Sequence, residues 1–248
     1  MDRARSLPPD TCDNVLTVLI HAIASAYFVL LAARLLAQEA LASTVPLPDL
    51  LVTLLFIVGV LSYCTCSSLY RIVSLLDSGH AAFWQRVEKV GVIVLIWSFA
   101  VPFLFFQFHD NECLLWLYLG LITVIGVRSS VNLLAPPVER SVASNLMPIV
   151  IAFGVLCFLP VGHVFFWGSA CHESMVPEYV KYTALNVAGG LIYIARLPEW
   201  WNLMSGWAMR TYIMNLFLIY TAVLYSDKLI RACTSPTIPL PEQCSLWI

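Results

Sequence analysis

The chain has 248 residues, of which 60% are hydrophobic and 11% are charged, and its formal net charge is -2. Because soluble domains carry about 25% charged residues, this composition excludes a water-soluble globular protein and predicts a polytopic membrane protein. The small net charge gives no reason to expect nucleic acid as a partner. Residues 1–14 carry charges and two prolines ahead of an apolar run of full span length, so we expect no cleavable signal peptide.

Seven apolar runs follow one another along the chain, each close to the 20 or so residues that a membrane-spanning helix needs. They are Val15–Ala37, Leu50–Arg71, Val90–Phe108, Cys113–Leu134, Ala143–Trp167, Val180–Leu197 and Trp207–Leu229. Polar residues and a glycine pair make the sixth run the least apolar. The sequence therefore predicts an all-α seven-helix bundle with a cytoplasmic segment at 1–14, a transmembrane domain at 15–231 and an extended tail at 232–248.

The distribution of Lys and Arg predicts how these spans are oriented. With a cytoplasmic N-terminus, nine of these residues fall in inner segments and four in outer segments. Because cytoplasmic loops carry the excess of positive charge, we expect the N-terminus inside and the C-terminus outside. We expect an integral membrane protein of the endoplasmic reticulum or another endomembrane, surrounded by membrane lipids.

Four cysteines fall in the predicted outer segments, at Cys113, Cys171, Cys233 and Cys244. In an oxidising compartment they allow two disulfides between the outer loops and the tail. The alternative, free thiols, stays equally open at this point.

A pair of opposite charges lies at the mouths of two adjacent spans. Arg71 closes the second run, and Glu88 stands just before the third, after a short polar loop. An ionisable residue at membrane depth is costly, so it is a candidate functional site. The simpler interpretations are an Arg71 side chain that reaches the lipid headgroups and a Glu88 that favours a helix start.

Four stretches resemble motifs of the progestin and adiponectin receptor / haemolysin III family, and the likeness covers nearly all seven spans. DNVLTVLIHA at 13–22 is similar to the family's xNxxTHxxG, and residues 99–108 with 114–127 are similar to its third and fourth spans. FLPVGHVFF at 158–166 lies where the family has a Pro and a His, and GGLIYIARLPEWW at 189–201 is similar to GxxxYxxRxPER. The resemblance implies a seven-helix bundle with a cytoplasmic N-terminus.

The family's members bind zinc through three histidines, and an aspartate at the start of span three holds a zinc-bound water. Here Ser67 begins the S-x-x-x-H motif of span two, but Arg71 stands where the motif has His, and Glu88 stands at the Asp position. Thr211 and Asn215 take the two His positions of span seven, and a shifted register gives no histidine there either. Because a guanidinium does not ligate a metal, we predict a zinc-free site with no cofactor.

We interpret the chain as a membrane-bound terpene cyclase that carries out the acid-initiated cyclisation of an apolar isoprenoid, epoxy-isoprenoid or meroterpenoid substrate. The expected partner is therefore an apolar lipid or isoprenoid small molecule. Glu88 is the predicted acid and Arg71 its electrostatic partner, while Asp227 is the alternative acid on the outer side. The predicted substrate-binding residues are Ser67, Thr211, Asn215, Trp97 and Tyr212. Two histidines within spans, His21 and His163, are interpreted as hydrogen-bonded core residues.

A second hypothesis comes from a different class of protein. A lipid or sterol receptor, or an inactive scaffold, accounts for the lost zinc ligands equally well, with Arg71 binding an anionic headgroup. Residual hydrolase activity requires a metal and ranks last.

Overall fold

The computed structural model describes residues 9–42, 45–76, 80–109, 111–135, 146–167, 175–195 and 206–234. Every regular element among these residues is an α-helix, which confirms the predicted fold class. The helices are α1 (Pro9–Ala42), α2 (Leu47–Leu76), α3 (Ala81–Gln107), α4 (Glu112–Leu134), α5 (Leu146–Cys157), α6 (Leu159–Trp167), α7 (Val176–Ala195) and α9 (Gly206–Thr234).

Five helical segments are long and apolar enough to cross a membrane: Asn14–Ala40, Leu47–Leu76, Ala81–Gln107, Glu112–Leu134 and Tyr212–Cys233. They coincide with five of the predicted runs, so the chain is an integral membrane protein. The helices also reach beyond those runs. Residues 9–14 belong to α1 and residues 232–234 to α9, whereas the sequence assigned them to the N-terminal segment and the tail. Residues 1–8 and 235–248 lie outside the described residues.

The predicted fifth run is interrupted. It contains α5 and α6, which meet at Phe158, and a shorter apolar segment, Ala152–Phe166, crosses that junction. Pro160 follows the junction, and proline lacks the backbone N–H of a helix interior and restricts the residue before it. The predicted sixth run corresponds to α7, and its last two residues lie outside the described part of the chain.

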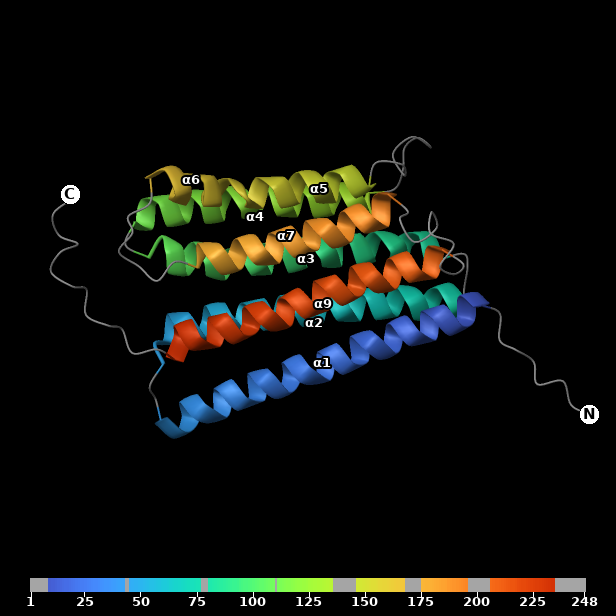
Figure 1. The fold of residues 1–248 in the computed structure, drawn as a ribbon, viewed down its shortest axis with the longest axis horizontal. Helices are drawn as coiled ribbons and strands as arrows, with labels where there is room; N and C mark the ends of the chain where they lie inside the picture. The colour runs from blue at the N-terminus through green and yellow to red at the C-terminus, as the bar shows by residue number, and fades with distance from the viewer. Residues whose placement is uncertain are drawn as a thin grey trace, which may run out of the picture.

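All these helices run along the long axis of the bundle (Figure 1). The most extensive packing is between α2 and α3, followed by α1 with α2 and α7 with α9. At Gly59 of α2 a Cβ atom would overlap the Ser98 side chain of α3, so the two helices approach closely there. Helix α1 begins at one end of the bundle and α9 ends at the other (Figure 1), as an odd number of crossings requires.

Aromatic rings from several helices form the middle of the core. Phe99 of α3 stacks on Tyr182 of α7 with ring centroids 3.3 Å apart, and its centroid lies 3.9 Å from that of Tyr225 of α9. Phe103 stacks on Tyr179, and Phe56 of α2 lies edge-on to Tyr225. We call these residues the aromatic cluster. Apolar side chains on the outer helix faces, such as Leu30 and Val124, are exposed, as lipid-facing residues are.

Candidate functional site

The C-terminal half of α2 carries a polar stripe on its buried face. Tyr63, Ser67 and Arg71 follow one another at four-residue spacing, so they share one face of the helix. All three are buried, although α2 is otherwise a strongly apolar span. The stripe meets α3 at Glu88 and α9 at Asn215, and its Tyr63 ring meets α1 at His21.

Glu88 is the centre of a small charged group. Ser67 Oγ donates a hydrogen bond to Glu88 Oε1 at 3.0 Å, and Arg71 Nη2 lies 3.7 Å from the same oxygen. Lys89 Nζ lies 3.7 Å from Glu88 Oε2. The side chains of Arg71 and Glu88 are each 7% exposed and that of Lys89 is 15% exposed. We call these four residues the charge cluster, and the sequence predicted its Arg71–Glu88 contact.

Three polar groups surround the Glu88 carboxyl group. They are the Arg71 guanidinium, the Lys89 ammonium and the Ser67 hydroxyl. The sequence predicted Arg71 as the partner of Glu88 and Ser67 as a nearby substrate-binding residue. Lys89 was not part of the predicted site. Because it adds a second cation, the charge cluster carries one excess positive charge.

A second polar group adjoins the charge cluster one helical turn along α2. The Tyr63 hydroxyl donates to Asn215 Oδ1 at 2.8 Å, and the His21 ring lies edge-on to the Tyr63 ring with centroids 5.6 Å apart. His21 Nδ1 is 2.8 Å from the Thr17 carbonyl oxygen. Both groups contact the buried face of α2, at Tyr63 and at Ser67, so they share one interior region.

Other predicted site residues lie elsewhere. Trp97 of α3 donates from Nε1 to Thr123 Oγ1 of α4 at 2.9 Å. Helix α4 contributes no residue to the charge cluster. Tyr212 of α9 is half-buried. Thr211 is on α9, but its side chain is outside the described part of the structure.

Asp227 does not share the interior with Glu88. It follows Asn215 by 12 positions on α9, which is about 18 Å along a helix. Its side chain is 63% exposed and pairs with Arg231, with Oδ2 and Nη2 2.7 Å apart. This surface ion pair gives Asp227 no contact with the polar groups of the interior.

His21 is buried and hydrogen-bonded to the Thr17 carbonyl, as the core interpretation expected, but the sequence did not predict its contact with Tyr63. Tyr63 was overlooked although its position four residues before Ser67 was visible, because aromatic residues are common in spans. His163, the other histidine within a span, is bonded through Nδ1 to the Tyr118 hydroxyl at 2.9 Å, as the core interpretation expected.

The residues of the charge cluster do not suit zinc. Among the described residues, no three His, Cys, Asp or Glu side chains converge to hold a metal. The space beside Glu88 is taken by Arg71 and Lys89, which repel a cation.

The four cysteines that the sequence placed in outer segments divide into two pairs. Cys113 and Cys233 are free thiols, and Cys171 and Cys244 lie outside the described residues.

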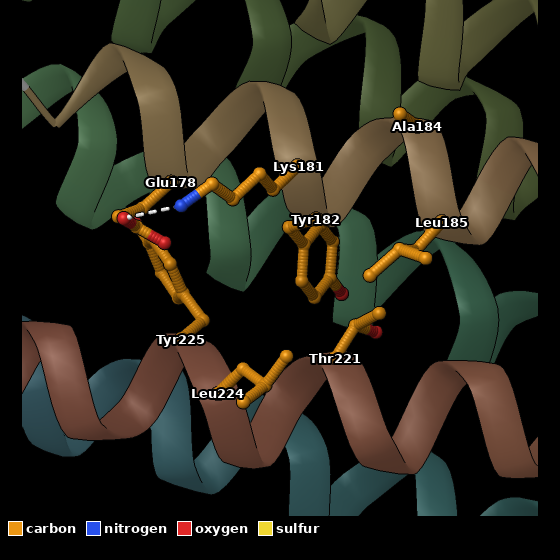
Figure 2. Close-up of a pocket in the computed structure, with 8 residues that line it drawn as sticks. All are labelled: Glu178, Lys181, Tyr182, Ala184, Leu185, Thr221, Leu224 and Tyr225. Atoms are coloured by element: carbon orange, nitrogen blue, oxygen red, sulfur yellow. Dashed lines mark hydrogen bonds and ion pairs between the residues drawn. The ribbon is translucent and has the colours of Figure 1, made fainter.

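A pocket of about 330 Å³ lies between α7 and α9 (Figure 2). Tyr182 and Leu185 of α7 face Thr221, Leu224 and Tyr225 of α9 across it. Glu178 and Lys181, paired at 3.0 Å, lie at one side of the pocket (Figure 2). Thr221 is six positions beyond Asn215, or about 9 Å along α9, so the pocket and the polar groups occupy successive levels of the bundle.

Comparison with known proteins gives a family match over most of the chain. The profile of the family described as "Haemolysin-III related" matches residues 11–209. Heptahelical transmembrane protein 3 of Arabidopsis thaliana is 28% identical over 158 residues, which are 60% of this chain and 44% of that protein. The adiponectin receptor protein of Drosophila melanogaster is 21% identical over 208 residues, which are 75% of this chain and 45% of that protein.

A third relative, heptahelical transmembrane protein 5 of Arabidopsis thaliana, is 25% identical over 151 residues, covering 59% of this chain and 40% of its own length. The matches with these relatives thus span less than half of the relatives' own lengths. The matched region contains every residue of the charge cluster.

Proposed function

The chain belongs to the haemolysin III-related family, and on that basis we propose that its interior site works without zinc and receives an apolar isoprenoid or lipid. The polar end of this ligand meets the charge cluster. Its apolar body extends toward the aromatic cluster, which lies further along α3. Glu88 and Phe99 are 11 positions apart, or about 16 Å along the helix, so the ligand is elongated.

The reaction that we propose is the acid-initiated cyclisation of an epoxide-bearing isoprenoid or meroterpenoid, the work of a terpene cyclase. Glu88 gives a proton to the epoxide oxygen, the carbon–oxygen bond breaks, and a double bond of the same chain attacks the electron-poor carbon. The final cation loses a proton, so substrate and product are isomers. Arg71 orients Glu88, and a dry interior protects the cation from water.

The observation that carries this proposal is a carboxylate buried among polar partners in an otherwise apolar bundle. Such a group is costly at membrane depth, which makes it a functional residue by default. The aromatic cluster supports the proposal because the faces of aromatic rings stabilise a nearby cation. A metal site would support hydrolysis rather than cyclisation, but the two cations of the charge cluster do not fit a metal ion.

Lys89 provides a sharp test of the role of Glu88. If Glu88 is the acid, Lys89 competes with the substrate for its carboxyl group, because Lys89 Nζ lies 3.7 Å from Glu88 Oε2. Lys89→Gln frees this oxygen to reach the substrate and is then expected to raise the cyclisation rate severalfold.

The experiment incubates the purified protein in lipid nanodiscs with a prenylated aromatic epoxide and follows isomer formation by mass-resolved chromatography. Glu88→Gln is expected to abolish turnover, since an amide is not a useful proton donor. Lys181→Gln is the matched control for Lys89→Gln, because it removes a lysine whose carboxylate partner lies on α7, far from Glu88 along the chain. Turnover by Glu88→Gln at the parent's rate would refute the assignment of the acid.

A receptor is the second candidate, and one observation favours it: Arg71 and Lys89 place two cations beside one carboxylate, and the excess cation suits an anionic headgroup. A relative from Drosophila is also called an adiponectin receptor protein. A receptor would bind a lipid or sterol reversibly and return it unchanged. Recovery of unaltered ligand from protein that binds it would favour this candidate over the cyclase.

We also propose a cytoplasmic N-terminus and a location in the endoplasmic reticulum or another endomembrane. The exposed thiol of Cys113 at the start of α4 allows a test of the orientation. In sealed microsomes a membrane-impermeant maleimide is expected to label Cys113 only after the membrane is opened, as peptide mass analysis can show. Labelling of Cys113 in intact microsomes would reverse the proposed orientation.

A further inference from the structure

Among the buried nitrogen atoms without a hydrogen-bond partner in the described part of the chain are His21 Nε2 on α1 and Asn215 Nδ2 on α9. The residues are 0% and 1% exposed, respectively. Both contact Tyr63, which approaches His21 with its ring and Asn215 with its hydroxyl. Because buried polar atoms are nearly always paired, two such atoms beside one tyrosine call for a specific explanation.

The contact with the Thr17 carbonyl determines what His21 offers. Nδ1 lies 2.8 Å from this oxygen, and a carbonyl oxygen only accepts hydrogen bonds. Nδ1 therefore carries the hydrogen, and Nε2 of the neutral ring is an acceptor. His21 presents a lone pair to the interior of the bundle.

The contact with Tyr63 determines what Asn215 offers. The tyrosine hydroxyl donates its single hydrogen to Asn215 Oδ1 at 2.8 Å, which uses the accepting end of the amide. The other end, Nδ2, has two hydrogens to donate. Asn215 therefore presents a donor, and His21 presents an acceptor.

We propose that His21 and Asn215 bind the hydroxyl group of an apolar alcohol, such as an isoprenoid alcohol. A hydroxyl group donates to His21 Nε2 through its hydrogen and accepts from Asn215 Nδ2 through its oxygen. Its apolar body lies among the apolar side chains of the bundle, where the aromatic cluster begins further along α9 and α3. Tyr63 holds both binding residues in place, His21 through its ring and Asn215 through its hydroxyl.

Other polar groups of lipids match this pair less well. Ketones, ethers and ionised carboxylates only accept hydrogen bonds, so each leaves the lone pair of His21 unpaired. An ammonium group only donates, so it leaves Asn215 Nδ2 unpaired. A site that binds a hydroxyl group rejects analogues without one, because they leave a buried polar atom of the protein without a hydrogen bond.

This inference goes beyond the proposed reaction, because alcohol binding requires no proton transfer from Glu88. The test uses two probes that differ only at the oxygen: farnesol, and farnesyl methyl ether, which accepts but does not donate. Affinities are measured by competition with radiolabelled farnesol on the full chain in nanodiscs. The parent is expected to bind the alcohol about tenfold more tightly than the ether, which corresponds to about 1.4 kcal/mol.

Two substitutions remove the pair while keeping side-chain volume similar: His21→Phe removes the acceptor and Asn215→Leu removes the donor. In each variant the preference for the alcohol is expected to fall below threefold. His163→Phe is the matched control, since His163 on α6 bonds Tyr118 and lies outside the pair. It is expected to keep the parent's preference.

The result on the parent protein alone already decides the proposal if a variant fails to fold. Equal affinities for alcohol and ether, or no binding of farnesol, would overturn it, as would a preference that survives both substitutions. Glu88→Gln separates this proposal from the cyclase. It is expected to lose turnover and to keep the preference for the alcohol.

Discussion

Arg71 Nη2 lies 3.7 Å from Glu88 Oε1 in the bundle interior, and Lys89 reaches the other oxygen of the same carboxylate. One anion thus compensates two cations that are both largely buried. Because Glu88 is the common partner of both cations, its loss should lower the stability of the protein more than the loss of either cation.

We expect Glu88→Gln to destabilise the protein more than Arg71→Gln or Lys89→Gln. Losing Glu88 leaves two buried cations together, whereas losing either cation leaves a neutral pair. Breaking a buried ion pair costs about 3–5 kcal/mol, and Glu88→Gln is expected to approach this range. Melting temperatures in detergent for the three variants would show the order, and equal losses for all three would contradict it.

Ser67→Ala is expected to destabilise the protein through loss of one hydrogen bond. The Ser67 hydroxyl donates to a charged oxygen of Glu88, and such bonds contribute about 1.5–3 kcal/mol. Ser62→Ala on the same helix is the control, because the Ser62 hydroxyl donates to the uncharged Val58 carbonyl of its own helix. If the two alanine variants melted together, the Ser67 bond would have no special role.

The packing of α7 against α9 predicts opposite results for two adjacent glycines. A Cβ on Gly189 would lie 2.9 Å from Phe217 Cβ, whereas a Cβ on Gly190 would meet nothing within 4 Å. Gly189→Ala is therefore expected to cost about 1–3 kcal/mol, as overpacking does. Gly190→Ala is expected to be neutral or stabilising, since alanine favours helices by up to about 1 kcal/mol. Thermal unfolding in detergent compares the two, and a stable Gly189→Ala variant would show that the helices can move apart.

The protein is expected to contain no stoichiometric zinc. Arg71 and Lys89 repel a metal ion at Glu88, so a strong chelator should leave the melting temperature unchanged. Elemental analysis of protein purified without added chelator measures the metal directly. One zinc per chain, lost in Glu88→Gln, would show that the charge cluster rearranges around a metal.

The spans and the Arg71–Glu88 contact could be predicted from the sequence for a physical reason. Apolar runs of span length become helices because the membrane interior offers backbone groups no other partner. A short loop between two spans makes them antiparallel neighbours, which brings the end of α2 to the start of α3. Local sequence carried this information. The interruption near Pro160 was not predicted, because the apolar run is long enough for one uninterrupted span.

The sequence by itself determined that this chain is a helical membrane protein, because hydrophobicity decides that, and it predicted an Arg71–Glu88 pair from the short connection between two spans. Only the tertiary structure decided that Tyr63 bonds Asn215, 152 positions away, and that Asp227 pairs with Arg231 on the surface. The rotation of each helix about its own axis decides such contacts. That rotation is set by packing against several neighbours at once, which no single stretch of sequence encodes.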